Sequence, residues 1–302
     1  MATAGKAVGK LGLIPATALV IGNLIGSGIF LLPSSLAPFG GLALVGWVFT
    51  AAGAILLALV FARLAQLAPK VGGPYIYSRL AFGDFAGFII AWGYWIGMWT
   101  SVAAVAVAMV SYLSGLIPVI GTNPMLAGGI AIGTIWLLTW VNARGVTAAG
   151  LMQTITTVLK LIPLVAIGTI GLFWADWSNF APTVPAGYPN TLSAILGAAS
   201  LTLFAFLGVE SATIPAGDVA DPGKTIPRAT IIGTVVTAIV YILSTIGVMG
   251  ALPPATLAAS SAPFADAAAA MWGPWAYPLV VLGAVISCFG AINGFILLQG
   301  QL

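Results

Sequence analysis

The sequence predicts an all-α, polytopic membrane protein that forms a single transmembrane domain over residues 1–302. Hydrophobic residues make up 61% of the chain and charged residues only 5%, whereas soluble domains carry about 25% charged residues. Eight apolar runs, bounded by Gly, Pro or charged residues, are long enough to cross the roughly 30 Å hydrocarbon core of a bilayer. The first and sixth runs are interrupted in mid-span by small or helix-breaking residues, which indicates discontinuous helices.

The eight expected spans follow from these boundaries. They cover approximately residues 12–37, 41–67, 84–114, 125–142, 150–174, 191–217, 229–252 and 275–301. The most polar connection is the loop expected at residues 218–228, and a short turn is expected at Gly72–Tyr75. A short amphipathic helix is expected near Phe264–Trp272, between the last two spans.

The residue types present argue against an enzyme. The chain has no His, and its only Cys is Cys288, so the usual metal clusters, Cys/His nucleophile pairs and structural disulfides are missing. We therefore expect no metal site and no cofactor. The net charge of +3 comes from basic residues spread along the whole chain, and without a basic patch we expect no nucleic-acid partner.

The basic residues predict the orientation of the chain in the membrane. With a cytoplasmic N-terminus, all basic residues outside the spans lie on the cytoplasmic side, as the positive-inside rule requires. These residues are Lys6, Lys10, Arg63, Lys70, Arg79, Arg144, Lys224 and Arg228. The acidic residues outside the spans divide between the outer side (Asp176 and Asp266) and the inner side (Asp84, Asp218 and Asp221). Lys160 and Glu210 are then the charged residues within spans.

The first interruption is Gly22–Pro33, GNLIGSGIFLLP. Glycine in a helix interior costs about 1 kcal/mol relative to Ala. Gly22 and Gly26 alone would suit a small-residue packing face. Gly26, Ser27 and Gly28 are consecutive, however, and point around all sides of a helix, which favours an unwound centre. A helix restarting there would direct free N–H groups, its positive dipole end and the Ser27 hydroxyl at an anion.

The second interruption is Leu207–Pro215, LGVESATIP, in the sixth span. Pro215 alone would be an ordinary kink, but Gly208 and Glu210 beside it repeat the peculiarity of the first span. Because the sixth span follows the first by five, it crosses the membrane in the opposite sense, as an inverted repeat of five spans requires.

This arrangement predicts two repeats. The first covers about residues 12–174, and the second starts near residue 191 and is incomplete at the C-terminus. The chain stops at Leu302, within or just after the eighth span, where a second repeat should continue to a tenth. We therefore expect a fragment of a longer protein.

Four segments resemble one family of membrane proteins. They are GNLIGSGIFLLP (Gly22–Pro33), GGPYIYSRLAFG (Gly72–Gly83), FLGVESA (Phe206–Ala212) and DPGKTIPRATIIG (Asp221–Gly233). All four are similar to motifs of the amino acid, polyamine and organocation (APC) transporter superfamily. Within its basic amino acid and polyamine antiporter branch, the likeness is greatest to bacterial arginine/agmatine antiporters and their putrescine/ornithine relatives. The resemblance implies a twelve-span, leucine-transporter-like fold, of which this chain holds the first eight spans.

The resemblance also implies a substrate site at the two interruptions. In the family, the Gly-Ser-Gly backbone of the first span holds the substrate carboxylate, and carbonyls freed in the first and sixth spans take its α-amine. Carried over by motif, these roles fall on Ile25, Gly26, Ser27, Gly28, Ala205, Phe206 and Leu207. Phe204 lies beside them as an aromatic gate.

The side-chain pocket departs from the family pattern. Phe204 and Phe295 stand where the arginine/agmatine antiporters have Trp, and Val102 stands where they have Asn. Since Trp is the best cation–π platform and Asn can bond a guanidinium, these changes weaken the recognition of a cationic side chain. Tyr94 and Trp95 match the third-span aromatic pair of the family, or serve only in packing.

Two charged residues are expected to couple transport to protons. Lys160 resembles the fifth-span lysine of proton-coupled and neutral amino acid members, which moves the expected substrate toward neutral or small amino acids. The alternative is a structural ion pair between Lys160 and Glu210. Glu210 is expected to act as a gating or proton-sensing carboxylate, the alternative being a fixed bond to a polar group of a neighbouring helix.

The function expected from these features is secondary active transport of amino acids or related amines across the cytoplasmic (inner) membrane, by exchange or proton coupling. A channel would need a continuous polar lining, which spans interrupted only by Lys160 and Glu210 do not offer. A sensor or scaffold of the same fold that binds without transport is the alternative. The expected partners are the substrate, the lipid bilayer and, as a homodimer, a second copy of the chain.

Overall fold

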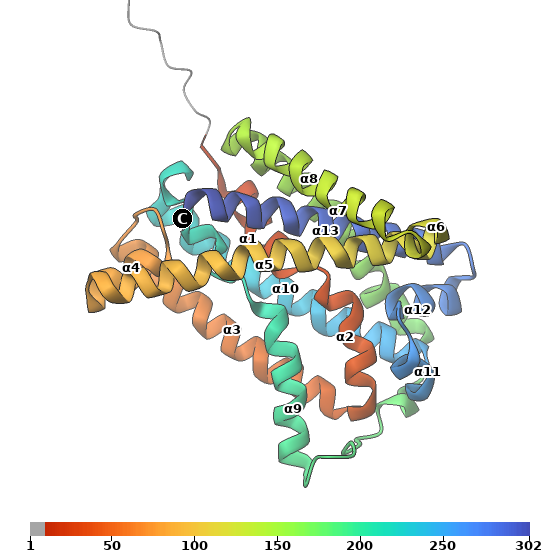
Figure 1. The fold of residues 1–302 in the computed structure, drawn as a ribbon. Helices are drawn as coiled ribbons and strands as arrows, with labels where there is room; N and C mark the ends of the chain where they lie inside the picture. The colour runs from red at the N-terminus through yellow and green to blue at the C-terminus, as the bar shows by residue number, and fades with distance from the viewer. Residues whose placement is uncertain (1–9) are drawn as a thin grey trace, which may run out of the picture.

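The computed structural model describes residues 10–302, which form helices and their connections (Figure 1). Lys6 lies outside the described residues. The α-helices are α1 (Leu13–Leu24), α2 (Gly28–Leu36), α3 (Leu42–Leu67), α4 (Pro74–Phe82), α5 (Asp84–Leu116), α6 (Pro118–Thr122), α7 (Pro124–Ala143), α8 (Val146–Thr169), α9 (Thr191–Leu203), α10 (Pro222–Ala251), α11 (Pro254–Ala259), α12 (Pro263–Trp272) and α13 (Ala276–Gln301). The 3₁₀ helices are η1 (Ala37–Phe39), η2 (Ile170–Trp174), η3 (Trp177–Phe180), η4 (Phe204–Phe206), η5 (Ser211–Thr213) and η6 (Ala216–Asp218).

The spans agree with the sequence prediction. In the described part of the chain, 7 segments are long and apolar enough to cross a membrane, and the bent pair α1 and α2 brings the number to 8. Most of their ends lie close to the predicted boundaries. The lengths agree because a helix that crosses the hydrocarbon core needs about 20 apolar residues. The helix expected near residues 264–272 is present as α12.

Two connections differ from the prediction. The segment expected as a loop at residues 218–228 is helical from Pro222 onward, because proline fits the first position of a helix, where its missing N–H is not needed. Asp221 precedes it with a φ of 45°. The turn at Gly72–Tyr75 leads directly into α4, with Gly73 at a φ of 45° before another first-position proline, Pro74.

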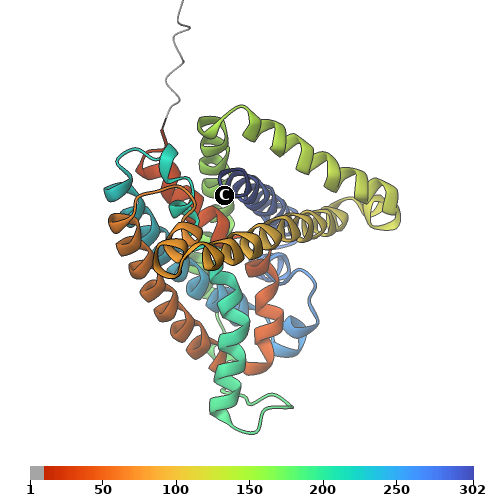
Figure 2. The same ribbon diagram turned by 60° about the vertical axis from the view of Figure 1, so that its left-hand side comes forward.

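Small residues bring the central helices close together. α10 packs against α3, α1 and α8, while α13 lies between α5 and α8 in both ribbon views (Figures 1 and 2). At the α8–α10 contact, a Cβ added at Gly168 would lie 2.9 Å from the backbone nitrogen of Ser244. At the α3–α9 contact, the hydroxyls of Thr50 and Thr202 share a hydrogen bond of 2.9 Å. Such contacts are typical of helices that associate within a bilayer.

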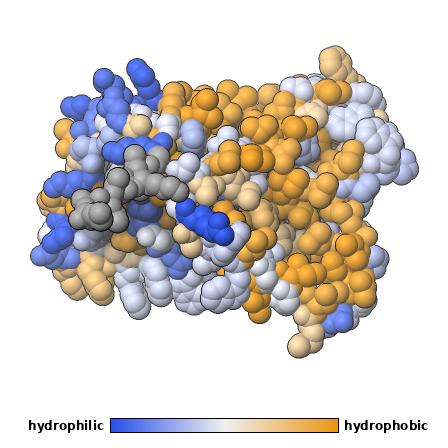
Figure 3. Space-filling model, turned by 90° about the horizontal axis from the view of Figure 1, so that it is seen from above, coloured by the Kyte–Doolittle hydropathy of each residue, from blue (hydrophilic) through white to orange (hydrophobic). Residues whose placement is uncertain are grey.

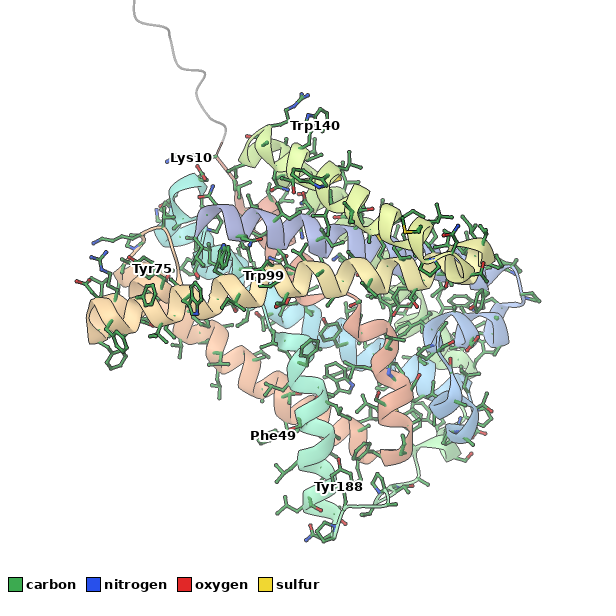
Figure 4. The ribbon with its side chains drawn as sticks, in the orientation of Figure 1. Lys10, Phe49, Tyr75, Trp99, Trp140 and Tyr188 are labelled. Atoms are coloured by element: carbon green, nitrogen blue, oxygen red, sulfur yellow. The ribbon has the colours of Figure 1, made fainter. Side chains whose placement is uncertain are left out.

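Charged residues gather at the ends of the bundle, as predicted. Figure 3 shows hydrophilic residues concentrated toward one end and hydrophobic residues over much of the rest of that face. We call this the basic end; it includes Lys10, Lys70, Arg79 and Lys224, which lie in or beside the segments that backbone bonds of Leu11 and Gly72 join to residues 214–220. Figure 4 shows Lys10 and Tyr75 on the same side, away from Tyr188. Which side of the membrane the basic end faces stays a prediction.

Candidate functional site

The first span is broken at its centre, as the sequence predicted. α1 ends at Leu24, residues 25–27 are not helical, and α2 begins at Gly28. The helix axis bends by 41° across this break. Ile25, with a ψ of 87°, takes the chain out of the helix, and carbonyls freed there find donors on neighbouring helices.

Lys160 of α8 is the charged donor at this break. Its side chain is fully buried, and its ammonium donates to the carbonyls of Gly22 at 2.8 Å, Ile25 at 2.5 Å and Ser287 at 3.5 Å. The Ser287 hydroxyl of α13 donates to the carbonyls of Ile25 and Gly26, at 3.1 and 3.0 Å. α1, α8 and α13 are thus joined by hydrogen bonds that offset part of the cost of burying a cation.

The start of α2 offers unpaired backbone donors. A helix leaves its first N–H groups without intrahelical acceptors, and in the described part of the chain no side chain caps those of α2. Gly26, Ser27 and Gly28 are partly exposed. Phe204 lies against them, since a Cβ added at Gly28 would be 3.8 Å from its ring. The result is a positive helix end beside an aromatic ring.

The sixth span is broken over a longer stretch than predicted. α9 ends at Leu203, and the chain runs through η4, η5 and η6 before α10 begins. Gly208 has a φ of 110°, a conformation that favours glycine. Its backbone packs against α1, since a Cβ at Gly208 would lie 3.4 Å from the Cβ of Asn23. The two breaks are therefore in contact.

Tyr241 of α10 joins the two breaks, and sequence analysis missed it. Its hydroxyl donates to the carbonyl of Leu24 at 2.5 Å and to that of Ala205 at 3.1 Å. A single tyrosine in an apolar span carries no sequence signal that separates it from a packing residue.

Glu210 bonds to Tyr94 rather than to Lys160. The Tyr94 hydroxyl of α5 donates to Glu210 Oε1 at 2.7 Å, whereas the ion pairs of the described residues lie elsewhere, at the basic end. The alternative in which Lys160 and Glu210 neutralise each other is therefore wrong. Sequence analysis gave a fixed bond from Glu210 to a neighbouring helix as the alternative to a proton-sensing role, and the structure contains such a bond.

The remaining residues of the predicted pocket differ in burial. Val102 is buried in α5, and Phe295 is partly buried in α13, which packs against α5. Phe204 and Leu207 expose 67% and 61% of their surface. Of this group, Phe204 is the residue whose ring lies against Gly28 at the start of α2.

A family model described as amino acid permease matches residues 11–302. This chain belongs to the amino acid permease family. It is 40% identical over 295 residues to the "Cadaverine/lysine antiporter" of Escherichia coli strain K12, which covers 97% of this chain and 65% of that relative. It is 32% identical over 286 residues to the "Putrescine transporter PotE" of the same strain, covering 95% and 65%.

The protein of the same name from Haemophilus influenzae is 35% identical over 286 residues, covering 95% of this chain and 66% of the relative. The chain therefore spans about 65% of the length of these relatives. They lie within the predicted family of transporters, not of enzymes. The finer likeness to arginine/agmatine antiporters stays a prediction.

In this member of the family, backbone pairing closes the basic end. The Leu11 N–H donates to the Asp218 carbonyl at 2.7 Å, and the Ala220 N–H donates to the Leu11 carbonyl at 2.9 Å. The Gly72 N–H donates to the Ile214 carbonyl at 3.1 Å. The residues before α1 and those before α4 are thus both tied to the C-terminal part of the sixth-span break, residues 214–220.

Two side chains reinforce this closure. The Gln301 amide donates to Asp218 Oδ2 at 2.8 Å, which fixes the end of α13 to the same segment. Burial raises the pKa of Tyr77 to about 12, so its hydroxyl stays neutral beside Thr213 and can donate a hydrogen bond.

Proposed function

We propose that the protein is a secondary active transporter, an antiporter or proton-coupled permease, that moves amino acids or related amines by alternating access. The observation that carries this proposal is the pair of touching helix breaks. Non-helical backbone at membrane depth is tolerated where it lines a cavity or binds a ligand, and two such breaks together are typical of transporter substrate sites.

The start of α2 suits a carboxylate. The N–H groups of Gly28 and the residues after it, the Ser27 hydroxyl and the positive end of the helix dipole all favour an anion. Gly26 and Gly28 leave the backbone open to such a group.

The sixth-span break suits an ammonium group. In the described part of the chain, the carbonyls of Phe206 and Leu207 accept no hydrogen bond, and they lie in the segment that touches the first break. A substrate amine would supply the missing donor. The Ala205 carbonyl belongs to the same set but is shared with Tyr241.

We further propose a leucine-transporter-like inverted-repeat fold. The broken first and sixth spans, five apart and in contact, support it. Lys160 would act as the coupling cation, because its proton supplies the charge that strengthens the bonds from α8 to the carbonyls of Gly22 and Ile25. Glu210 would act as the gating carboxylate on the bond to Tyr94.

Lysine and cadaverine are suitable first probes, because a relative is named as a cadaverine/lysine antiporter. The pocket residues Phe204, Phe295 and Val102 favour a neutral or small substrate instead, so alanine belongs in the same survey. Binding without transport would support the sensor alternative.

The test is counterflow of labelled substrate in proteoliposomes that contain the full-length protein. We expect exchange by the wild type and its loss in Gly28→Val, whose added side chain would occupy the space between the start of α2 and Phe204. The matched control is Gly133→Val on α7, where an added Cβ meets nothing within 4 Å. The carboxylate site is contradicted if Gly28→Val exchanges normally and cadaverine binds as tightly as lysine.

A further inference from the structure

Tyr241 occupies the point where the two breaks meet. Its side chain is completely buried in α10, and its ring lies against Trp47 of α3 and Phe206 of η4, with ring centroids 5.1 and 5.6 Å apart. Trp47 and Phe206 are themselves 6.0 Å apart in an edge-on arrangement. This aromatic cluster fixes the ring, so that the hydroxyl has little freedom to seek other partners.

The hydroxyl carries one proton but has two acceptors. Leu24 is the last residue of α1, and Ala205 lies just beyond the end of α9. The bond to the Leu24 carbonyl is 2.5 Å and that to the Ala205 carbonyl is 3.1 Å. The Leu24 carbonyl also accepts a hydrogen bond from the Gly26 N–H at 3.1 Å. Among the described residues, the donor to the Ala205 carbonyl is the Tyr241 hydroxyl. One hydroxyl therefore connects both breaks.

We propose that Tyr241 is a positioning residue that links the two breaks, and that its hydroxyl gives up the longer bond to Ala205 and keeps the shorter bond to Leu24 when a substrate amine arrives. The inference rests on the proposed function, because the Ala205 carbonyl is one of those assigned to the amine. An ammonium donating to this carbonyl repels the positive hydroxyl hydrogen. The hydroxyl then bonds Leu24 alone, so that occupancy of the sixth-span break is transmitted to the end of α1.

Removal of the hydroxyl tests both parts of the proposal. In Tyr241→Phe the ring cluster keeps its volume, and the Ala205 carbonyl loses its donor in the empty protein. A buried carbonyl without a partner destabilises that state, and a substrate amine restores the bond. We therefore expect Kd to fall by about tenfold and the rate of exchange to fall with it, since release must again leave the carbonyl unpaired. A merely structural role would raise Kd or leave it unchanged.

The first measurement needs no substrate. Hydrogen–deuterium exchange of the empty, full-length protein is followed at the amides of residues 24–30 and 204–211. We expect faster exchange in both segments for Tyr241→Phe. The matched control is Tyr188→Phe, because the Tyr188 hydroxyl forms no hydrogen bond with the described residues. Its deuterium exchange should match that of the wild type. An increase in neither segment, or in one alone, overturns the link.

The second measurement is lysine and cadaverine binding together with counterflow. Lower KM with lower kcat supports the shift of the hydroxyl bond, and an unchanged or raised KM overturns it. 3-Fluorotyrosine at position 241 is a stronger hydrogen-bond donor of similar size, so it should slow deuterium exchange in both segments and raise KM and kcat. This replacement covers the case in which Tyr241→Phe does not insert into the membrane. If the wild type binds neither these probes nor alanine, the proposed function fails, and deuterium exchange alone decides the link.

Discussion

At the scale of single residues, Lys160 shows how a buried cation can be held without a carboxylate. Its ammonium bonds carbonyls of α1 and α13 and lies beside the thiol of Cys288. Loss of its proton would remove the charge from these bonds and loosen the contact between α8 and the break. The protonation state of Lys160 is therefore coupled to the contact between α8 and the first break.

We expect Lys160→Met to separate exchange from accumulation. The methionine keeps most of the volume but cannot donate, so counterflow should survive while uphill accumulation and its pH dependence are lost. Leu159→Met, on the exposed side of the same helix, is the control. The measurements are counterflow and accumulation over a range of pH. A sodium requirement, combined with normal accumulation by Lys160→Met, would rule out the coupling role.

Glu210 is expected to set the pH dependence of gating. An acid within a broken span is costly unless it has a partner or water, and its partner is the Tyr94 hydroxyl. Glu210→Gln keeps an acceptor for Tyr94 but removes the titratable group, so the pH profile of exchange should flatten while the protein stays folded. Tyr94→Phe removes the hydrogen bond but keeps the Glu210 carboxyl, so the pH profile of exchange should shift while exchange stays pH-dependent. An unchanged profile in a well-expressed Glu210→Gln would mean that the residue is only structural.

At the scale of the elements, the spans and both breaks could be predicted, because apolar length and clustered glycines leave a chemical signature in the sequence. The partners at the breaks could not. Lys160 and Gly22 are 138 positions apart, and no local pattern shows whether a buried ammonium meets a carboxylate or freed carbonyls. The helical start of α10 was missed for a different reason, since Pro, Gly and Asp suit a loop as well as a first turn.

The contact between α1 and α8 provides a test of packing. A Cβ added at Gly22 would overlap the Gln153 side-chain amide and would lie 2.9 Å from the Thr157 hydroxyl oxygen. Gly22→Ala should therefore lower the free energy of unfolding by about 1–3 kcal/mol through overpacking. Gln153→Ala should partly rescue it, which a double-mutant cycle of thermal stability in detergent would measure. Gly53→Ala, at an exposed helical site with open space, should be neutral or stabilising. No coupling between Gly22 and Gln153 would contradict this account.

At the scale of the whole molecule, the bundle is tied together at one end and interrupted at its centre. The basic end is closed by backbone bonds from the segments before α1 and α4 to residues 214–220. The breaks lie further along the same spans, where the helices meet through small residues and single side-chain bonds. A transporter that works by alternating access must open the tied end during each cycle.

Locking the basic end should therefore stop exchange without stopping binding. Leu11 and Val219 form a parallel β-bridge, and bridged residues lie within the roughly 4.4–6.8 Å Cα separation that a disulfide needs. We expect Leu11→Cys combined with Val219→Cys, in a Cys288→Ala background, to lose counterflow on oxidation and to recover it on reduction. Lysine binding from the opposite end should persist, because the start of α2 is untouched. The single-cysteine variants are the controls. Efficient cross-linking with undiminished exchange would show that this end need not open, and transport would then require another route past the breaks.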